Sequence, residues 1–182
     1  MEDFAFILDY LAQGLADAKR FRREPLAFAL GEQEFKLLEL VPQPDATFTI
    51  GEKVYIGKDL DQRTRVLHVK RRVGWEELTT AAQNELPFVL EQLIKADEQR
   101  FLRFYNDSGA VSTRLHVLEL LPGLGKKTMV RILDERKKRP FATLAGITER
   151  IPQIHHPEKL IAKRIEQEIA DPSQKYHIFV AP

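Results

Sequence analysis

The first 73 residues alternate short apolar runs with glycine, proline and acidic breaks, a pattern typical of β-strands. Residues 66–73 have the clearest two-residue period, in which Val66 and His68 face one side and Leu67 and Val69 the other. The expected strands cover residues 4–8, 26–30, 35–41, 48–50, 54–56 and 66–73. Short strands with glycine and proline between them predict a small antiparallel barrel or sandwich.

From Trp75 onward the apolar positions recur at intervals of three and four residues, which indicates helices. Pro87 separates two of them, since proline cannot continue a helix but suits the first turn of a new one. The expected helices cover residues 76–86, 88–105, 114–121, 126–138, 141–150 and 157–169. The predicted organisation is a β-barrel at 1–74, connecting helices at 75–111, an all-helical domain at 112–170 and a tail at 171–182. The predicted fold class is α+β.

The composition of the 182 residues suits a folded protein, with 43% hydrophobic and 30% charged residues. The absence of cysteine excludes disulfides, thiol catalysis and zinc–thiolate sites. No apolar stretch reaches the ~18–20 residues that span a bilayer, and the acidic start lacks the basic region of a signal peptide. We therefore expect a cytoplasmic protein that does not enter a membrane.

The formal net charge of +1 hides a segregation of charge along the chain. Residues 1–111 hold 15 Lys and Arg against 19 Asp and Glu, a net charge of −4. Residues 112–170 hold 12 against 7, a net charge of +5. A basic C-terminal part points to a polyanionic partner, although a solvated basic helix face gives the same count.

The most informative segment is Leu120-Leu121-Pro122-Gly123-Leu124-Gly125-Lys126-Lys127, where two glycines flank one leucine before a basic helix. Glycine lets the chain turn sharply and lets a partner approach the bare backbone. The first N–H groups of the following helix have no acceptor within it, so they form an anion site. Lys126 and Lys127 oppose the helix dipole there, which makes sense if an anion lies beside them.

Residues 115–136 resemble the helix-hairpin-helix motif, a binder of nucleic-acid backbones. The resemblance rests on Leu118, Leu121, Pro122, Gly123, Leu124, Gly125, Lys126, Ile132 and Arg136. It implies binding without sequence preference, with the amides around Gly123 and Gly125 on phosphate. The binding residues expected in this part of the chain are Gly123, Leu124, Gly125, Lys126, Lys127, Arg131 and Lys138. The alternative is an ordinary turn between helices that ends in glycine.

Some members of that motif hold a monovalent cation with loop carbonyls, which here would be those of Glu119, Leu121 and Leu124. A degenerate second copy follows at residues 151–160, with Gln153 and His155 in place of the two glycines. Together the two copies suggest a tandem helix-hairpin-helix domain. Without the glycines, close approach of a phosphate to the second copy is not expected.

The predicted barrel resembles an OB-like or S1-like domain, and such folds bind single strands with basic and aromatic side chains. Two basic clusters, Lys19–Arg23 and Lys70–Arg72, stand out in the acidic half of the chain. From these clusters Arg22, Arg23 and Arg71 are expected to contact nucleic acid. Phe21 and Trp75 lie in or near the clusters, but packing is the alternative role for both.

Several catalytic interpretations are excluded because the residues that they require are absent from the sequence. The stretch 120–127 lacks the first glycine of a P-loop, and the residue after Lys126 is Lys127 instead of serine or threonine. A helix-hairpin-helix glycosylase needs an aspartate where residues 141–145 have none. The adjacent His155 and His156 lack a carboxylate cluster with ligand spacing, so no side-chain metal site is expected. We expect no enzyme activity and no cofactor.

Nearly the whole chain resembles an uncharacterised, mainly archaeal family of predicted nucleic-acid-binding proteins that combine a barrel with this hairpin. The resemblance rests on residues 23–26, Gly51-Glu52 and residues 113–141. The leading hypothesis is a binder of RNA or DNA backbones without sequence specificity. The alternatives are a nucleic-acid-processing enzyme with an unrecognised active site and a protein-interaction adaptor. In the last case the apolar tail at 176–180 could add a strand to the barrel or to a protein partner.

Overall fold

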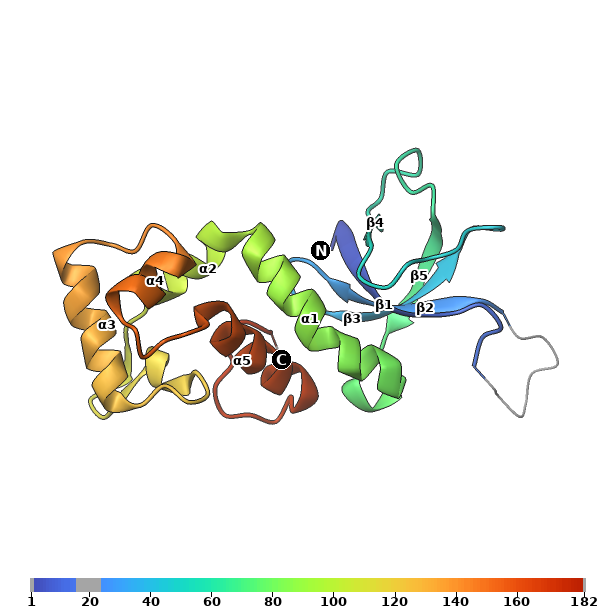
Figure 1. Cartoon of the computed structure of the whole chain (residues 1–182). Coiled ribbons are helices and arrows are strands. Elements are labelled where there is room, and N and C mark those ends of the chain that lie inside the picture. The colour runs from blue at the N-terminus through green and yellow to red at the C-terminus, as the bar shows by residue number, and fades with distance from the viewer. Residues whose placement is uncertain (1, 16–23, 182) are drawn as a thin grey trace. The chain divides into compact units, whose positions relative to one another are not determined.

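The computed structural model describes residues 2–15 and 24–181, which form an α+β fold, as the sequence predicts. A curled antiparallel sheet of five strands comes first in this described chain, and five α-helices follow (Figure 1). The strands are β1 (Phe4–Leu11), β2 (Leu26–Gly31), β3 (Leu37–Pro42), β4 (Lys53–Tyr55) and β5 (Val66–Arg72). The helices are α1 (Thr80–Ala96), α2 (Glu98–Asp107), α3 (Lys126–Lys138), α4 (Leu144–Arg150) and α5 (Pro157–Ala170). Two short 3-10 helices, η1 (Trp75–Glu77) and η2 (Val117–Leu120), and two small strands, β6 (Ala110–Ser112) and β7 (Leu115–His116), complete the described elements.

The sheet has the strand order β4-β1-β2-β3-β5, and all neighbouring strands are antiparallel. Alternate residues point to one face and form a single core cluster, which includes Ala5, Ile7, Ala27, Ala29, Leu38, Leu40, Val54 and Val66. Three of these side chains are alanines, and such small side chains let the sheet curl around a narrow interior. β5 is an edge strand, and most of its side chains are exposed.

The other face of the sheet is also covered, because Leu8, Phe28 and Leu30 are fully buried. The segment that leads into α1 lies beside β1, where the hydroxyl of Thr79 donates to the carboxylate of Asp9 at 2.5 Å. With both faces buried, β2 reads as a continuous apolar run rather than as an alternation.

The predicted strand at residues 48–50 is wrong, because the chain is irregular there. Phe48 is buried in the sheet's core with its ring edge-on to Tyr10 at 5.5 Å between centroids. Gly51 then has a φ of +79° and donates its N–H to the carbonyl of Ile7 at 2.7 Å. The aromatic residue therefore reflects core packing in a loop and not a strand.

The predicted helix break at Pro87 is also wrong, because α1 runs through this residue. Proline lacks one helical N–H, which costs about 3 kcal/mol inside a helix. Leu86, Val89 and Leu90 are buried around it, and each such burial contributes about 2 kcal/mol. The packing outweighs the lost bond, and the helix ends instead before Asp97, whose φ of −120° and ψ of 52° are not helical.

The tail does not form a strand among the residues described. Its consecutive N–H groups of Ile178, Phe179 and Val180 donate to the carboxylate of Glu168 at 2.8–2.9 Å. Glu168 is almost fully buried, so its charge needs such donors. The tail is therefore held by a buried acid on α5.

By its packing, the chain divides into two compact units, residues 1–89 with 168–182 and residues 90–167. The division falls within α1 and within α5, and the segment 171–182 belongs with the sheet. Among the described residues, no helix combines the length and apolar character needed to cross a bilayer.

Candidate nucleic-acid interface

The predicted hairpin is a tight turn that joins η2 to α3. The N–H of Leu124 donates to the carbonyl of Leu121 at 3.1 Å, with Pro122 and Gly123 between them. Gly123 has a φ of +81°, which glycine adopts without strain, and proline suits the position before it. The side chains of Leu121 and Leu124 are buried. The turn is therefore anchored by its leucines while Gly123 stays exposed at its tip.

The segment before this turn is not the helix predicted over residues 114–121. β6 and β7 pair there, and η2 adds a single 3-10 turn. His116 caps η2, since its Nδ1 accepts the N–H of Leu118 at 3.1 Å. Leu121 is extended, with a φ of −71° and a ψ of 129°, as the residue before a proline prefers. The cap on one side and the proline on the other leave room for one turn only.

The helix α3 has the predicted limits, Lys126 to Lys138, and no side chain caps its first turn. The first helical bond runs from the N–H of Met129 to the carbonyl of Gly125 at 3.0 Å. The N–H groups of Lys126, Lys127 and Thr128 thus precede the helical ladder. Gly125 has no side chain to cap them, and the first turn contains no acidic residue.

Neither the backbone conformation nor the packing around Gly125 requires a glycine at this position. Its φ of −85° and ψ of 171° suit any residue, and an added Cβ would have no atom within 4 Å. A larger N-cap such as serine or aspartate would stabilise the helix. With glycine at this position, the backbone at the start of α3 is exposed.

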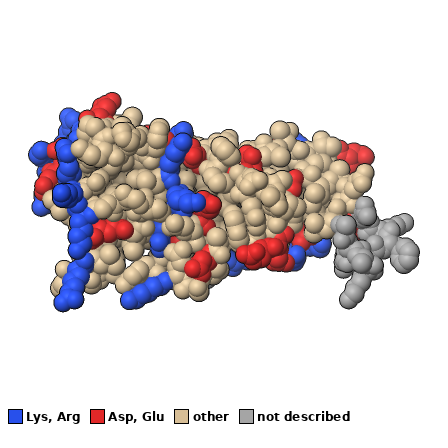
Figure 2. Space-filling model, turned by 60° about the horizontal axis from the view of Figure 1, so that its bottom comes forward, with Lys and Arg blue, Asp and Glu red and all other residues tan. Residues whose placement is uncertain are grey.

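Cations without acidic partners extend along the exposed side of α3. Within the described chain Lys126, Lys127 and Arg131 are exposed and form no salt bridge, and the same holds for Lys137 and Arg139. Figure 2 shows Lys and Arg side chains in a row at the left, over α3. Lys137 and Arg139 are not among the binding residues predicted from the sequence, although the run 136–139 is wholly basic.

Other cations near α3 form salt bridges or hydrogen bonds within the protein. Lys138 lies 2.6 Å from the carboxylate of Glu135, and that hydrogen bond, together with one from Arg150, lowers the pKa of Glu135. Arg136 donates to the carbonyls of Tyr105 at 3.0 Å and Ser108 at 2.8 Å, at the end of α2. Of the predicted binding residues on α3, Lys138 is therefore partly neutralised.

The structure gives less support to the binding residues predicted in the barrel, Arg22, Arg23 and Arg71, than to those on α3. Arg71 contacts two carboxylates, Glu39 at 2.9 Å and Glu77 at 2.5 Å. Glu39 is buried, so Arg71 has a structural task in neutralising it. Arg71 belongs to the unit of the sheet and not to the unit of the hairpin. Arg22 and Arg23 lie outside the described residues.

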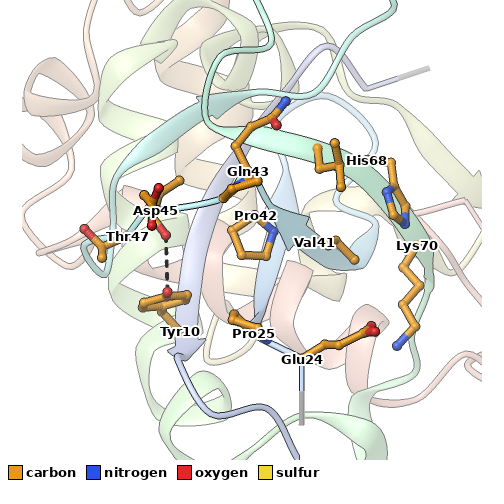
Figure 3. Close-up of a pocket in the computed structure, with 13 residues that line it drawn as sticks. Tyr10, Glu24, Pro25, Val41, Pro42, Gln43, Asp45, Thr47, His68 and Lys70 are labelled. Atoms are coloured by element: carbon orange, nitrogen blue, oxygen red, sulfur yellow. Dashed lines mark hydrogen bonds between the residues drawn. The ribbon is translucent and has the colours of Figure 1, made fainter. Parts of the chain in front are cut away.

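A groove of about 770 Å³ lies beside the sheet. Pro42 occupies its centre, with Tyr10 on one side and His68 and Lys70 on the other (Figure 3). Lys70 is paired with Glu39 at 2.6 Å, and the lining also carries the carboxylates of Glu24 and Asp45. The apolar part of its lining comes from Pro25, Val41, Pro42, Pro44, Ala46 and Leu67. This chemistry suits an uncharged group better than a phosphate.

The second hairpin repeats the turn of the first. The N–H of Ile154 donates to the carbonyl of Ile151 at 2.9 Å, with Pro152 again in second position. α5 follows as α3 follows the first turn. However, α5 begins with Pro157, which has no N–H, and Glu158 places a carboxylate in its first turn.

The predicted carbonyl site for a monovalent cation lies at a hollow of about 450 Å³ lined by residues 119–125 and Gln167. The carbonyl of Leu121 also accepts the N–H of Leu124. Whether a cation binds there stays a prediction. Among the described residues, no three His, Asp or Glu side chains are arranged to hold a metal ion.

A family model described as a protein of unknown function, DUF655, matches residues 1–181. The chain belongs to the DUF655 family. An uncharacterized protein of Methanocaldococcus jannaschii is 42% identical over 180 residues, which is 98% of this chain and 80% of that protein. The predicted kinship with an uncharacterised family that has archaeal members is thereby confirmed.

A DUF655 crystal structure from Archaeoglobus fulgidus has the same fold. Its TM-score with this chain is 0.92, the two sequences are 47% identical, and the match covers 99% of this chain and all of that one. The α+β arrangement described above is thus shared within the DUF655 family.

Proposed function

We propose that this DUF655 protein binds the sugar–phosphate backbone of RNA or DNA without sequence preference. The observation that carries the proposal is the stretch from Gly125 to Arg131. There a glycine that neither the backbone conformation nor the packing requires precedes a helix start without a side-chain cap. Three exposed cations that form no salt bridge follow it. Contacts of backbone amides and lysine ammonium groups with phosphates carry no information about the bases, so no sequence preference is expected.

The distribution of charge supports this proposal. Residues 90–167 contain 15 Lys and Arg against 10 Asp and Glu, a net charge of +5. The other unit has a net charge of −4. Charges in solution act over about 8–10 Å at physiological salt, so a polyanion responds to the local charge near α3 and not to the total of +1.

The proposal includes the finer fold that the sequence suggests. The five-stranded curled sheet is compatible with an OB-like half-barrel. The two similar turns, each followed by a helix, are compatible with a tandem helix-hairpin-helix domain whose first helix is shortened to η2. In this account the hairpin unit supplies the phosphate contacts and the sheet supplies a second surface.

The test is fluorescence anisotropy with labelled RNA and DNA oligonucleotides over a range of salt concentrations. Changing Lys126 and Lys127 to alanine should weaken binding about tenfold, since an exposed ion pair contributes up to about 1 kcal/mol. The slope of log K against log salt should also fall by about 1.4–1.8, because each lost phosphate contact contributes about 0.7–0.9.

The matched control is Lys58→Ala/Lys175→Ala, which removes two exposed lysines from the other unit. It should leave both the affinity and the salt slope unchanged. Equal losses in the two double variants would show non-specific attraction to charge, and no binding at any salt concentration would refute the proposal.

The groove of Figure 3 favours a second candidate role, a protein-interaction surface. Its proline-rich lining lies next to the exposed edge strand β5, which contributes Leu67, His68 and Lys70. A Leu67→Glu variant separates the two roles. It should leave nucleic-acid affinity unchanged, and it should abolish any nuclease-resistant protein complex that purifies with the native chain.

A further inference from the structure

The two hairpins of the unit 90–167 have similar geometry but different chemistry. Each turn has one backbone hydrogen bond across it, 3.1 Å in the first and 2.9 Å in the second, and each leads into a helix. If both turns held phosphates, the pair could contact both strands of a duplex. The second turn therefore decides how many strands the protein can hold.

The second turn is unsuited to a phosphate. Glu158 stands in the first turn of α5, 3.5 Å from His156 Nδ1 and 3.9 Å from Lys95 Nζ. Pro157 offers no N–H. A phosphate at this helix start would lose one donor and face a carboxylate.

The basic residues of α5 do not compensate. Lys163 is paired with Glu166 at 3.1 Å, and Arg164 is buried with only 7% of its surface exposed. Within the described part of α5, Lys159 alone is an exposed cation without an acidic partner. The second hairpin thus has the shape of the first without its means of binding anions.

On α3 the cations extend along the whole helix. Exposed Lys126 and Lys127 stand at its start, Arg131 lies in its middle, and Lys137 and Arg139 lie at its end. Thirteen residues at 1.5 Å each give a length of about 18–20 Å. At about 3.4 Å per phosphate along one stacked strand, this length serves about five nucleotides.

We propose that α3 holds one nucleic-acid strand over about five nucleotides and that the second hairpin holds none, so that a single strand of RNA or DNA is sufficient for full binding. This inference rests on the proposed function and specifies its ligand. A protein that contacts only one strand makes no further contacts with the complementary strand, so pairing does not raise its affinity for that strand. A duplex offers at most two equivalent strands, so its affinity exceeds that of a single strand by a statistical factor of about two at most.

The experiment compares a single-stranded 12-mer with its duplex in the same anisotropy assay, and adds oligonucleotides of three, five and eight residues. The single strand should bind at least half as tightly as the duplex, and affinity should rise steeply only up to about five nucleotides. Lys137→Ala/Arg139→Ala should reduce the salt slope, whereas Lys159→Ala/Lys163→Ala should leave it unchanged.

A duplex that binds more than about twofold tighter than the single strand overturns the inference, and so does an equal loss of slope in the α5 variant. Both results leave the proposed function intact, provided that Lys126→Ala/Lys127→Ala still weakens binding. Absence of any binding refutes the proposed function itself, so the two failures are distinguishable.

Discussion

The N–H of Leu124 donates to the carbonyl of Leu121, and this bond fixes the turn that places the exposed backbone of Gly125 at the start of α3. Two glycines lie close together here for different reasons. Gly123 is required by the turn, since its φ is +81°. Gly125 has an ordinary backbone conformation and open space around it.

Serine substitutions at Gly123 and Gly125 test whether the backbone conformation requires glycine at the first position and not at the second. Gly123→Ser should destabilise the protein by about 1–2 kcal/mol, because a side chain at positive φ is strained. Gly125→Ser should be neutral or slightly stabilising, since serine is a favoured N-cap. Urea denaturation of the two variants measures the difference. Equal destabilisation by both would contradict the assignment of the two roles.

Gly125→Asp should uncouple stability from binding. The carboxylate caps α3 and interacts favourably with the positive end of its dipole, which should raise the free energy of unfolding by about 0.5 kcal/mol. The same carboxylate occupies the N–H groups offered to phosphate and repels it, so affinity should fall about tenfold or more. Thermal unfolding and anisotropy on one preparation test both effects, and a more stable variant with undiminished affinity would remove the helix start from the interface.

Arg136 and Arg131 should respond differently to the same substitution. Arg136→Met removes the two hydrogen bonds to the end of α2 and should cost about 2 kcal/mol of stability, with little change in the salt slope of binding. Arg131→Met, on the exposed side of α3, should leave stability unchanged and lower the slope by about 0.7–0.9. Urea denaturation and salt titration of both variants give the comparison, and exchanged phenotypes would be evidence against it.

Glu135 makes the stability of the hairpin unit depend on pH. Hydrogen bonds from Lys138 and Arg150 hold the pKa of Glu135 below its usual value of 4.5. A carboxyl with a depressed pKa contributes stability above its unfolded pKa and loses it as the pH falls through the folded value. The native chain should thus unfold at a higher temperature than Glu135→Gln at pH 6, and the gap should shrink toward pH 3. A gap that stays constant over this range would rule out the ionised carboxylate as its source.

The elements that the sequence predicts well are those with a repeated pattern and clear ends. α3 has the predicted limits because glycine precedes its first residue and Pro140 follows its last by two. The α+β class follows from the change of period near Trp75. Local residues decide these features, so local reasoning suffices.

Apart from the helix predicted over residues 114–121, which local capping and Pro122 shorten, the errors come from interactions between distant residues. Phe48 looks like part of a strand, but it packs on Tyr10 from a loop. Pro87 looks like a helix end, but the burial of its neighbours keeps α1 intact. The tail looks like a strand, but Glu168 binds its amides. Such contacts are set by the fold and are not visible in the local pattern.

The candidate site was predictable only in part. The motif of Gly123, Gly125 and Lys126 follows from spacing, whereas the pairing of Arg71 with Glu39 and Glu77 depends on neighbouring strands and η1. The sequence counts cations, and the structure shows which of them already have partners.

The most direct measurement is the shift of backbone amide resonances on titration with a single-stranded oligonucleotide. We expect the largest shifts on Gly125, Lys126, Lys127 and Thr128, with smaller ones along α3. The amides of residues 158–160 and of the non-proline residues of the groove at 41–47 should move little. Largest shifts in either of those segments, or none near Gly125 while the oligonucleotide binds, would contradict the central claim.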